Sequence, residues 1–172
     1  MAFGLRLAMW VMQAASVLST LLCSLVAGFL FSFAVVVMPG IKILDVRAFI
    51  RSFQVMDGVI QNNQLAFVLV WIGSIVFLPA AVLLGFWYLN GVGWSLLLIA
   101  TLVYLLGVQL PTILINLPLN KQLQSQNVAS LDEQSLKEVR DNFEQRWNLS
   151  NLFRTGVACL TSVLLMILLF IL

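Results

Sequence analysis

Long uncharged stretches alternate with shorter polar ones along the chain. Thirty-five uncharged residues separate Arg6 from Lys42, and sixty-three separate Asp57 from Lys121. A helix needs about 20 residues to cross the hydrocarbon core of a bilayer, so the first stretch holds one span and the second holds two. A third long uncharged run closes the chain and holds the fourth span. The pattern predicts an all-α membrane protein, a four-transmembrane-helix bundle within a single integral membrane domain of residues 1–172. The expected spans are 14–38, 65–87, 94–115 and 155–172.

Two further segments have helical periodicity but are too polar to span a bilayer. Between residues 41 and 64, apolar positions fall on one helical face and polar positions on the other. This predicts an amphipathic helix after the first span, lying at the membrane surface or folded against the bundle. Residues 132–147 predict a charged helix that leads into the fourth span. Residues 116–126 are expected to form a polar connector, and residues 90–93 a turn.

Proline and small residues shape the expected spans. Pro39 and Gly40 are expected to end the first span, because proline disfavours helix in the residue before it. Pro79 and Pro111 are expected to bend their helices. The first span carries two rows of small residues at a spacing of four: Ser16, Thr20, Ser24, Gly28 and Ser32, and Ala15, Ser19, Cys23 and Ala27. We interpret these rows as an inward packing face, since small residues let membrane helices approach closely. Chance is the alternative, because apolar helices are rich in small residues.

Composition places the chain in a membrane and narrows its chemistry. It is 62% hydrophobic and 9% charged, whereas about a quarter of the residues of a soluble domain are charged. Membrane lipids are therefore expected partners. A net charge of +2, with no basic run among aromatic residues, argues against nucleic acid. Histidine is absent, and Cys23 and Cys159 lie far apart, so we expect no metal site and no bound cofactor.

The distribution of lysine and arginine predicts the orientation. Eight of the nine lie in the two long connections, residues 41–64 and 116–154. By the positive-inside rule these connections face the cytoplasm and both termini face outside. We expect the plasma (cell inner) membrane as the location.

Polar side chains gather in three groups that four spans would bring to one membrane surface: Gln54, Asp57 and Gln61; Asn116 and Asn120; and Trp147, Asn151 and Arg154. Together they would place amides, one carboxylate and one guanidinium at the cytoplasmic mouth of the bundle. Such a site suits a carbonyl or phenolate group on a small lipophilic aromatic ligand.

Each group also has a purely structural interpretation. Arg154 could anchor its helix at the headgroups by snorkelling, and Trp147 could be an ordinary interface residue. Asn116 and Asn120 could be capping and turn residues. Gln54 and Asp57 could form the solvated face of an amphipathic helix.

Several of these residues belong to a recognisable pattern: Gly28 to Gly40, Phe53-Gln54, Asn116-Leu-Pro118-Leu-Asn120, and Trp147-x3-Asn151-x2-Arg154-Thr155. Over residues 20–170 the chain resembles the anthrone oxygenase-like family of small four-helix membrane proteins. The resemblance implies a membrane bundle and, as in a few fungal members, oxidation of anthrones to anthraquinones without bound metal or flavin. It also implies that the family-matching polar positions are Gln54, Asn116, Asn120, Trp147, Asn151 and Arg154. The chain departs from the family by having Asp57 where members often have asparagine.

Two functions are consistent with these residues. In a cofactor-independent oxygenase, Asp57 would be the base that makes a carbanion, and Arg154, helped by Asn120 and Asn151, would stabilise the oxyanion. Trp147 would stack on the aromatic substrate, and Gln54 and Asn116 would complete the binding site. The alternative is a non-catalytic membrane protein that binds a lipophilic molecule or serves as a structural or transport subunit.

Overall fold

The computed structural model describes residues 2–172, and this part of the chain is 90% helix, with no strand among these residues. The α-helices are α1 (Ala2–Ser32), α2 (Met38–Lys42), α3 (Val46–Gln61), α4 (Leu65–Tyr88), α5 (Gly91–Tyr104), α6 (Leu117–Gln124) and α7 (Glu133–Ile171). Three five-residue π-helical segments join some of them: η1 (Phe33–Val37), η2 (Leu105–Gln109) and η3 (Thr112–Asn116). Among the described residues, four helices are long and apolar enough to cross a membrane, which confirms the predicted bundle: Arg6–Lys42, Leu65–Tyr88, Gly91–Gln124 and Glu133–Ile171.

Two of these four helices are longer than the sequence pattern predicts. Pro39 and Gly40 do not end the first one, because α1, η1 and α2 follow one another without a break as far as Lys42. Residues 116–126 are not a connector either, since η3 and α6 carry the helix on to Gln124. How much of each helix lies in lipid remains a prediction.

The π-helical segments explain how the helices continue through proline. Each of η1, η2 and η3 ends two residues before a proline: Pro39, Pro111 and Pro118, respectively. Proline lacks an N–H, and its ring clashes with the carbonyl four residues earlier. A wider π turn shifts the hydrogen bonding to i→i+5, so the helix absorbs the proline instead of ending.

The helix α1 packs against both α4 and α7, and α5 packs against α4 and α7. The predicted small-residue face is correct only in part. Ser16, Ser19, Cys23 and Ala27 are buried, but Gly28 is exposed, and so is Ser32 further along the row. A row with a spacing of four rotates by about 40° at each step, because the α-helix has 3.6 residues per turn. The row therefore leaves the buried side, where bulky Val26 and Leu30 take over.

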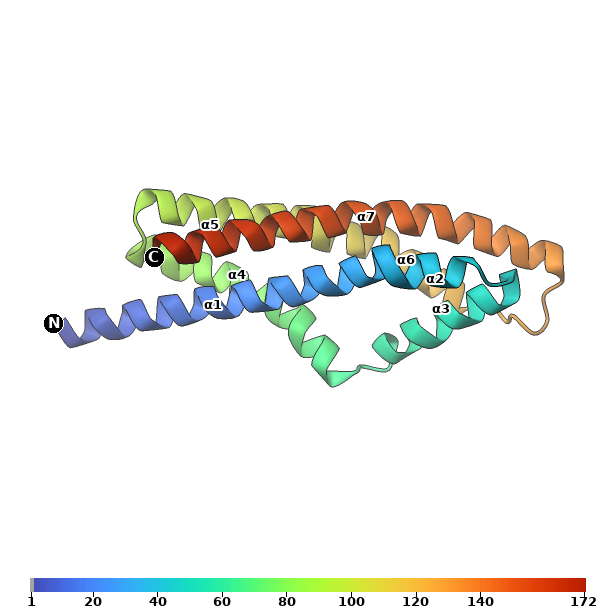
Figure 1. Cartoon of the computed structure of the whole chain (residues 1–172). Helices are drawn as coiled ribbons and strands as arrows, with labels where there is room; N and C mark the ends of the chain where they lie inside the picture. The colour runs from blue at the N-terminus through green and yellow to red at the C-terminus, as the bar shows by residue number, and fades with distance from the viewer. Residues whose placement is uncertain (1) are drawn as a thin grey trace.

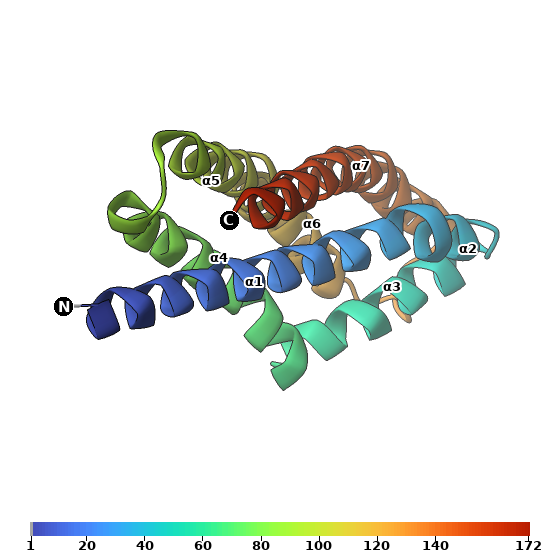
Figure 2. The same ribbon diagram turned by 60° about the vertical axis from the view of Figure 1, so that its left-hand side comes forward.

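The helix α3 is folded against the bundle, which settles the alternative that the sequence left open. Its residues Phe49, Ile50 and Phe53 are buried in an apolar cluster with side chains of α6 and the first half of α7. Figure 2 shows α3 running back beside α2, which it contacts. Arg47 donates to the carbonyls of Val128 and Leu131, so it ties the start of α3 to the loop before α7.

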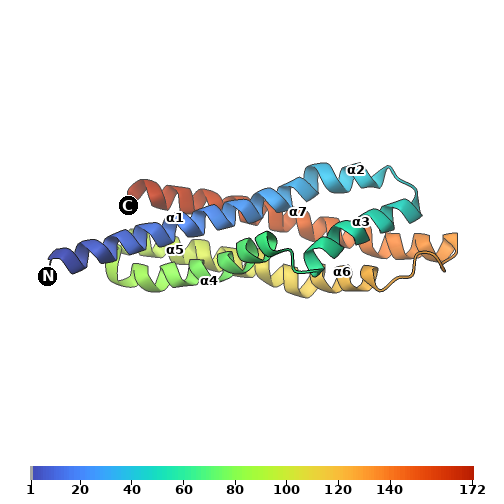
Figure 3. The same cartoon turned by 90° about the horizontal axis from the view of Figure 1, so that it is seen from below.

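Both chain ends lie at the same end of the bundle as the α4–α5 turn (Figures 1 and 3). The α2–α3 and α6–α7 connections lie at the opposite end. This arrangement gathers the two basic connections at one end, as the orientation argument requires. It also directs α3, α6 and the middle of α7 toward one region of the interior.

Candidate functional site

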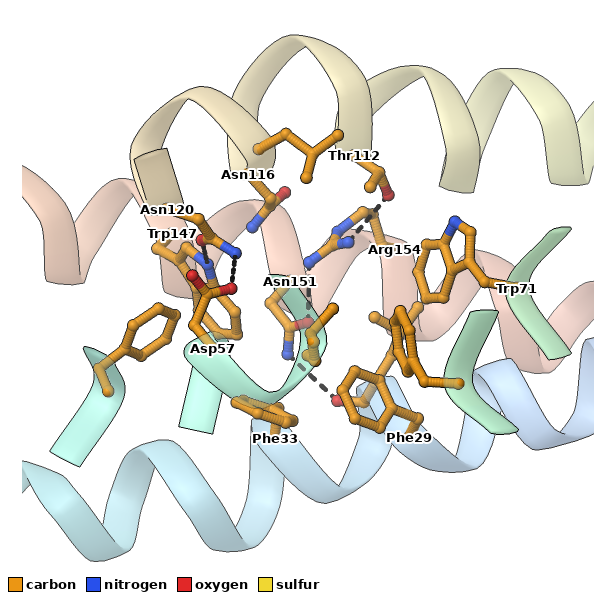
Figure 4. Close-up of a pocket in the computed structure, with 15 residues that line it drawn as sticks. Phe29, Phe33, Asp57, Trp71, Thr112, Asn116, Asn120, Trp147, Asn151 and Arg154 are labelled. Atoms are coloured by element: carbon orange, nitrogen blue, oxygen red, sulfur yellow. Dashed lines mark hydrogen bonds between the residues drawn. The ribbon is translucent and has the colours of Figure 1, made fainter. Parts of the chain in front are cut away.

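A cavity of about 210 Å³ lies where α1, α3, α4, η3, α6 and α7 meet (Figure 4). Six of the fifteen side chains that line it are aromatic: Phe29, Phe33, Phe53, Phe67, Trp71 and Trp147. A cavity of about 150 Å³ holds one benzene ring, so this one accommodates a small aromatic group. Its ionisable lining residues are Asp57 and Arg154.

The carboxylate of Asp57 is buried and held by amides. Asp57 is 4% exposed. Its Oδ1 accepts a hydrogen bond from Asn120 Nδ2 at 2.8 Å, and its Oδ2 accepts from Gln124 Nε2 at 3.0 Å and from Gln61 Nε2. Trp147 Nε1 donates to Asn120 Oδ1 at 2.8 Å. A hydrogen-bonded chain therefore joins α7 to α6 and α6 to α3.

The guanidinium of Arg154 is buried without a carboxylate partner. Arg154 is 3% exposed. Its Nη1 donates to Thr112 Oγ1 at 2.9 Å, and its Nη2 donates to Asn151 Oδ1 at 3.0 Å. The ion pairs among residues 2–172 are Arg47–Glu133 and Arg140–Glu144, so none involves Arg154. A buried charge without an opposite charge costs several kcal/mol, on the order of the penalty for a desolvated ion.

Two N–H donors beside the cavity have no acceptor. Neither Arg154 Nε nor Asn116 Nδ2 has a hydrogen-bond partner within the described chain, although both atoms are buried. The other end of the Asn116 amide is fixed, because Oδ1 accepts from Ser150 Oγ at 2.6 Å. An unpaired buried donor costs about 1–3 kcal/mol. Such groups call for an explanation, and a ligand oxygen in the cavity is one.

Local helical periodicity presents these groups as two facing stripes. Thr112, Asn116 and Asn120 recur every four residues along η3 and α6. On α7, Trp147, Ser150, Asn151 and Arg154 share one face at spacings of three and four. The stripes run antiparallel and meet in three hydrogen-bonded pairs: Thr112 with Arg154, Asn116 with Ser150, and Asn120 with Trp147.

The structure brings together six of the seven residues to which the sequence gave a catalytic or binding role: Asp57, Asn116, Asn120, Trp147, Asn151 and Arg154 all line the cavity. Gln54 does not line it. Its Nε2 donates to the carbonyls of Leu123 and Gln126 at 2.8 and 3.1 Å, so it ties α3 to the end of α6. It lies one helical turn before Asp57 and therefore on nearly the same face, but the end of α6 covers it.

Two of the amides predicted to stabilise an oxyanion already have partners. Asn120 Nδ2 donates to Asp57, and Asn151 Nδ2 donates to the carbonyl of Leu30 at 3.1 Å. Asn116, which the sequence assigned only to substrate binding, is the one of these three asparagines whose Nδ2 has no partner in the described chain.

Sequence reasoning missed several contributors. Thr112 holds one arm of Arg154, Gln124 holds Asp57, and Phe67 and Trp71 form a stacked pair beside the cavity, with ring centroids 5.3 Å apart. Thr112 could have been found, because it precedes Asn116 by one helical turn. Phe67 and Trp71 show the same spacing at the start of α4, but an apolar span offers many such pairs.

No group of three or more His, Cys, Asp or Glu side chains able to hold a metal ion occurs in the part of the chain that the structure covers. The site consists of a carboxylate, a guanidinium, amides, hydroxyls and aromatic rings.

Comparison with known families and proteins gives one match. The sequence model described as anthrone oxygenase matches residues 65–164. The matched segment runs from the start of α4 into α7, so it includes the stripe on η3 and α6 and the stripe on α7. It leaves out α3 and Asp57. No curated protein and no solved structure matches the chain.

Proposed function

The chain belongs to the anthrone oxygenase family, and from this premise we propose that it oxygenates a lipophilic aromatic substrate in the cavity between Asp57 and Arg154. The observation that carries the proposal is the pairing of one carboxylate and one guanidinium without an ion-pair partner in a single aromatic-lined cavity. The chain is a membrane protein with four apolar helices in its described part, and this location suits a lipophilic substrate, which partitions into the bilayer.

In the first step Asp57 removes a proton from a CH₂ group that a ring carbonyl acidifies. The resulting charge spreads onto the carbonyl oxygen, and the guanidinium of Arg154 stabilises it there. A carboxylate has about four lone-pair sites, and three amides bond to that of Asp57. One site therefore remains for the substrate proton.

In the second step the carbanion reacts with molecular oxygen and forms a carbon–oxygen bond to a peroxide. Protonation of the outer oxygen, cleavage of the O–O bond and loss of the second C–H proton give a ketone and water. In total, CH₂ and O₂ become C=O and H₂O. The substrate supplies all four electrons that reduce the oxygen, so no other reductant is needed.

The test uses the purified protein in lipid nanodiscs with anthrone and ¹⁸O₂. We expect quinone formation above the rate with empty nanodiscs, and one ¹⁸O atom in each quinone. Asp57→Asn keeps the shape but not the base and should lower the rate by a factor of about 10²–10⁴. Asp141→Asn changes an exposed carboxylate on α7 in the same way and should leave the rate unchanged.

If the wild-type protein shows no turnover above the empty nanodiscs, the proposal fails. A second candidate function is then favoured by the three amides that hold Asp57, since they would equally stabilise a purely structural carboxylate. In that case the protein binds a lipophilic molecule without converting it.

A further inference from the structure

We propose that the cavity takes its ligand as an oxyanion, and that one ligand oxygen accepts from both Arg154 Nε and Asn116 Nδ2. The ligand class is a lipophilic aromatic weak acid, a phenol or enol whose deprotonated form the site holds most tightly, whether it enters as the anion or loses its proton to Asp57 in the cavity. The inference rests on the proposed function only in placing such a molecule in this cavity, and it requires no turnover.

The first argument is charge. Arg154 has hydroxyl and amide acceptors on its two terminal nitrogens but no carboxylate in the described chain within ion-pair distance. Asp57 lies on the other side of the cavity in Figure 4, and three amides hold it there. An anion beside Arg154 offsets the cost of burying the guanidinium, and a neutral ligand of the same shape does not.

The second argument is the pair of free donors. Arg154 Nε and Asn116 Nδ2 are buried donors without partners, and both residues line the cavity. Neither side chain is free to turn away, because the two remaining nitrogens of Arg154 and the oxygen of Asn116 are already hydrogen-bonded. Donors fixed in this way recognise an acceptor oxygen, and hydrogen bonds to a charged oxygen are about twice as strong as those between neutral groups.

The third argument is the aromatic lining of the cavity, which favours a ligand whose oxygen is attached to an aromatic ring. One wall of the cavity includes Phe29, Phe67 and Trp71, and Phe67 packs against both of the others. Aromatic faces stack on flat rings. A single ring with one ionised oxygen could therefore stack on these aromatic side chains while its oxygen accepts from both donors.

One consequence concerns the order of events at the site. An enolate is an anion, whereas the quinone formed from it is neutral and keeps only a carbonyl acceptor. The same pair of donors therefore holds the substrate anion more tightly than the product. The loss of charge on oxidation would favour product release into the bilayer.

The experiment compares 2,4-dinitrophenol, which is ionised at neutral pH, with its neutral methyl ether, 2,4-dinitroanisole. Binding to the protein in nanodiscs is followed by quenching of tryptophan fluorescence, since Trp71 and Trp147 line the cavity. Empty nanodiscs correct for partitioning into lipid. We expect the phenolate to bind about tenfold or more tighter than the ether. Equal affinities, or tighter binding of the ether, would overturn the inference.

The sharpest variant is Asn116→Asp. It keeps an oxygen for Ser150 but replaces the free donor with an anion next to Arg154. Phenolate affinity should fall by about tenfold or more, whereas binding of 2,4-dinitroanisole, which also reports that the cavity is folded, should change little. The control is Asn142→Asp, the same change at an exposed position of α7, which should leave both affinities unaltered. Unchanged phenolate binding in Asn116→Asp, or loss of both ligands, contradicts the assignment.

These measurements separate the two proposals. Selective binding of the phenolate without anthrone turnover leaves the oxyanion site standing and removes the oxygenase. Turnover of anthrone without a preference for the phenolate would support the oxygenase and remove the oxyanion site.

Discussion

A guanidinium carries five N–H donors in a rigid planar fork, and Arg154 uses its two ends differently. The terminal nitrogens bond to Thr112 and Asn151, and this orients the plane of the group. Nε is left beside the cavity without a partner in the chain as described. A snorkelling anchor would extend to the headgroups, whereas Arg154 is 3% exposed. At the level of one residue, this geometry supports the proposed binding role of Arg154, because two sides of the guanidinium are fixed.

Arg154→Lys tests this geometry. Lysine keeps the charge but is a point donor on a flexible stem, and it cannot bond Thr112 and Asn151 while also presenting a donor to the cavity. We expect phenolate affinity and any anthrone turnover to fall at least tenfold, by about 1.4 kcal/mol or more, with the helical content unchanged by circular dichroism. Affinity and turnover equal to those of the wild type would show that only the charge matters.

Trp147→Phe tests the hydrogen-bonded chain to Asp57. Phenylalanine keeps an aromatic ring against Phe53 and Phe33 but leaves the partly buried Asn120 Oδ1 without its indole donor. We expect unfolding in mixed micelles to require about 1–3 kcal/mol less free energy. Trp87→Phe, at an exposed position that is 76% accessible, should change the free energy of unfolding much less.

At the level of elements, the π-helical segments combine two roles. Each precedes a proline and keeps the helix continuous, and η3 in addition carries Thr112 and Asn116 to the cavity wall. π turns inside helices often occur at functional sites. The third helix therefore continues past Pro111 and Pro118 to bring Asn120 and Gln124 into reach of Asp57.

The close approach of η2 to α7 gives a stability prediction. A Cβ added at Gly107 would lie 2.6 Å from Cγ1 of Val157. Gly107→Ala should therefore destabilise the protein by about 1–3 kcal/mol, because the stiff valine cannot move aside without shifting its helix. In the control Gly156→Ala, the added Cβ would meet no atom of the described chain within 4 Å. Gly156→Ala should leave the free energy of unfolding unchanged or raise it by about 0.5–1 kcal/mol. Thermal unfolding in detergent measures both variants.

The start of α7 gives a pH prediction. Asp132 caps this helix, and Oδ1 accepts from the backbone N–H of Ser135 at 2.7 Å. This hydrogen bond lowers the pKa of the Asp132 carboxyl. A lowered folded-state pKa stabilises the helix start at pH values above the ordinary carboxyl pKa, and the stabilisation is lost as the pH falls through the folded-state value.

Hydrogen exchange at the Ser135 amide should therefore be slow near neutral pH. Corrected for intrinsic exchange, its protection should fall below about pH 4. Asp132→Asn retains a capping oxygen that does not titrate in this range, so its protection should not depend on pH. If the protection of the Ser135 amide in the wild-type protein did not change with pH, this would contradict the assigned role of Asp132 as the cap.

For the whole molecule, we propose that the end carrying the two long basic connections faces the cytoplasm. The structure gathers the α2–α3 and α6–α7 connections at the end opposite both termini (Figure 1). In spheroplasts, Val92→Cys at the α4–α5 turn should react with a membrane-impermeant maleimide, and Ser125→Cys after α6 should not. Both changes are made in a background without Cys23 and Cys159. The reverse pattern of labelling would invert the proposed orientation.

The number of helices and their apolar character follow from the sequence alone, because hydropathy and 3.6-residue periodicity are local properties. The same reasoning placed Trp147, Asn151 and Arg154 on one face of α7, where the structure has them. It also put Asp57 on the polar side of α3. These inferences needed only the spacing of residues along a single helix.

Only the tertiary structure decided which polar groups meet. The antiparallel register between α7 and the η3–α6 rod pairs Thr112 with Arg154 and leaves Asn116 with a free donor. It also places the end of α6 over Gln54, which bonds there instead of facing the cavity. This register depends on packing between residues 27 to 42 positions apart in the chain, and on π turns that shift the side chains around their helix. Neither can be read from the spacing within one helix, so the composition of the cavity was settled by the fold.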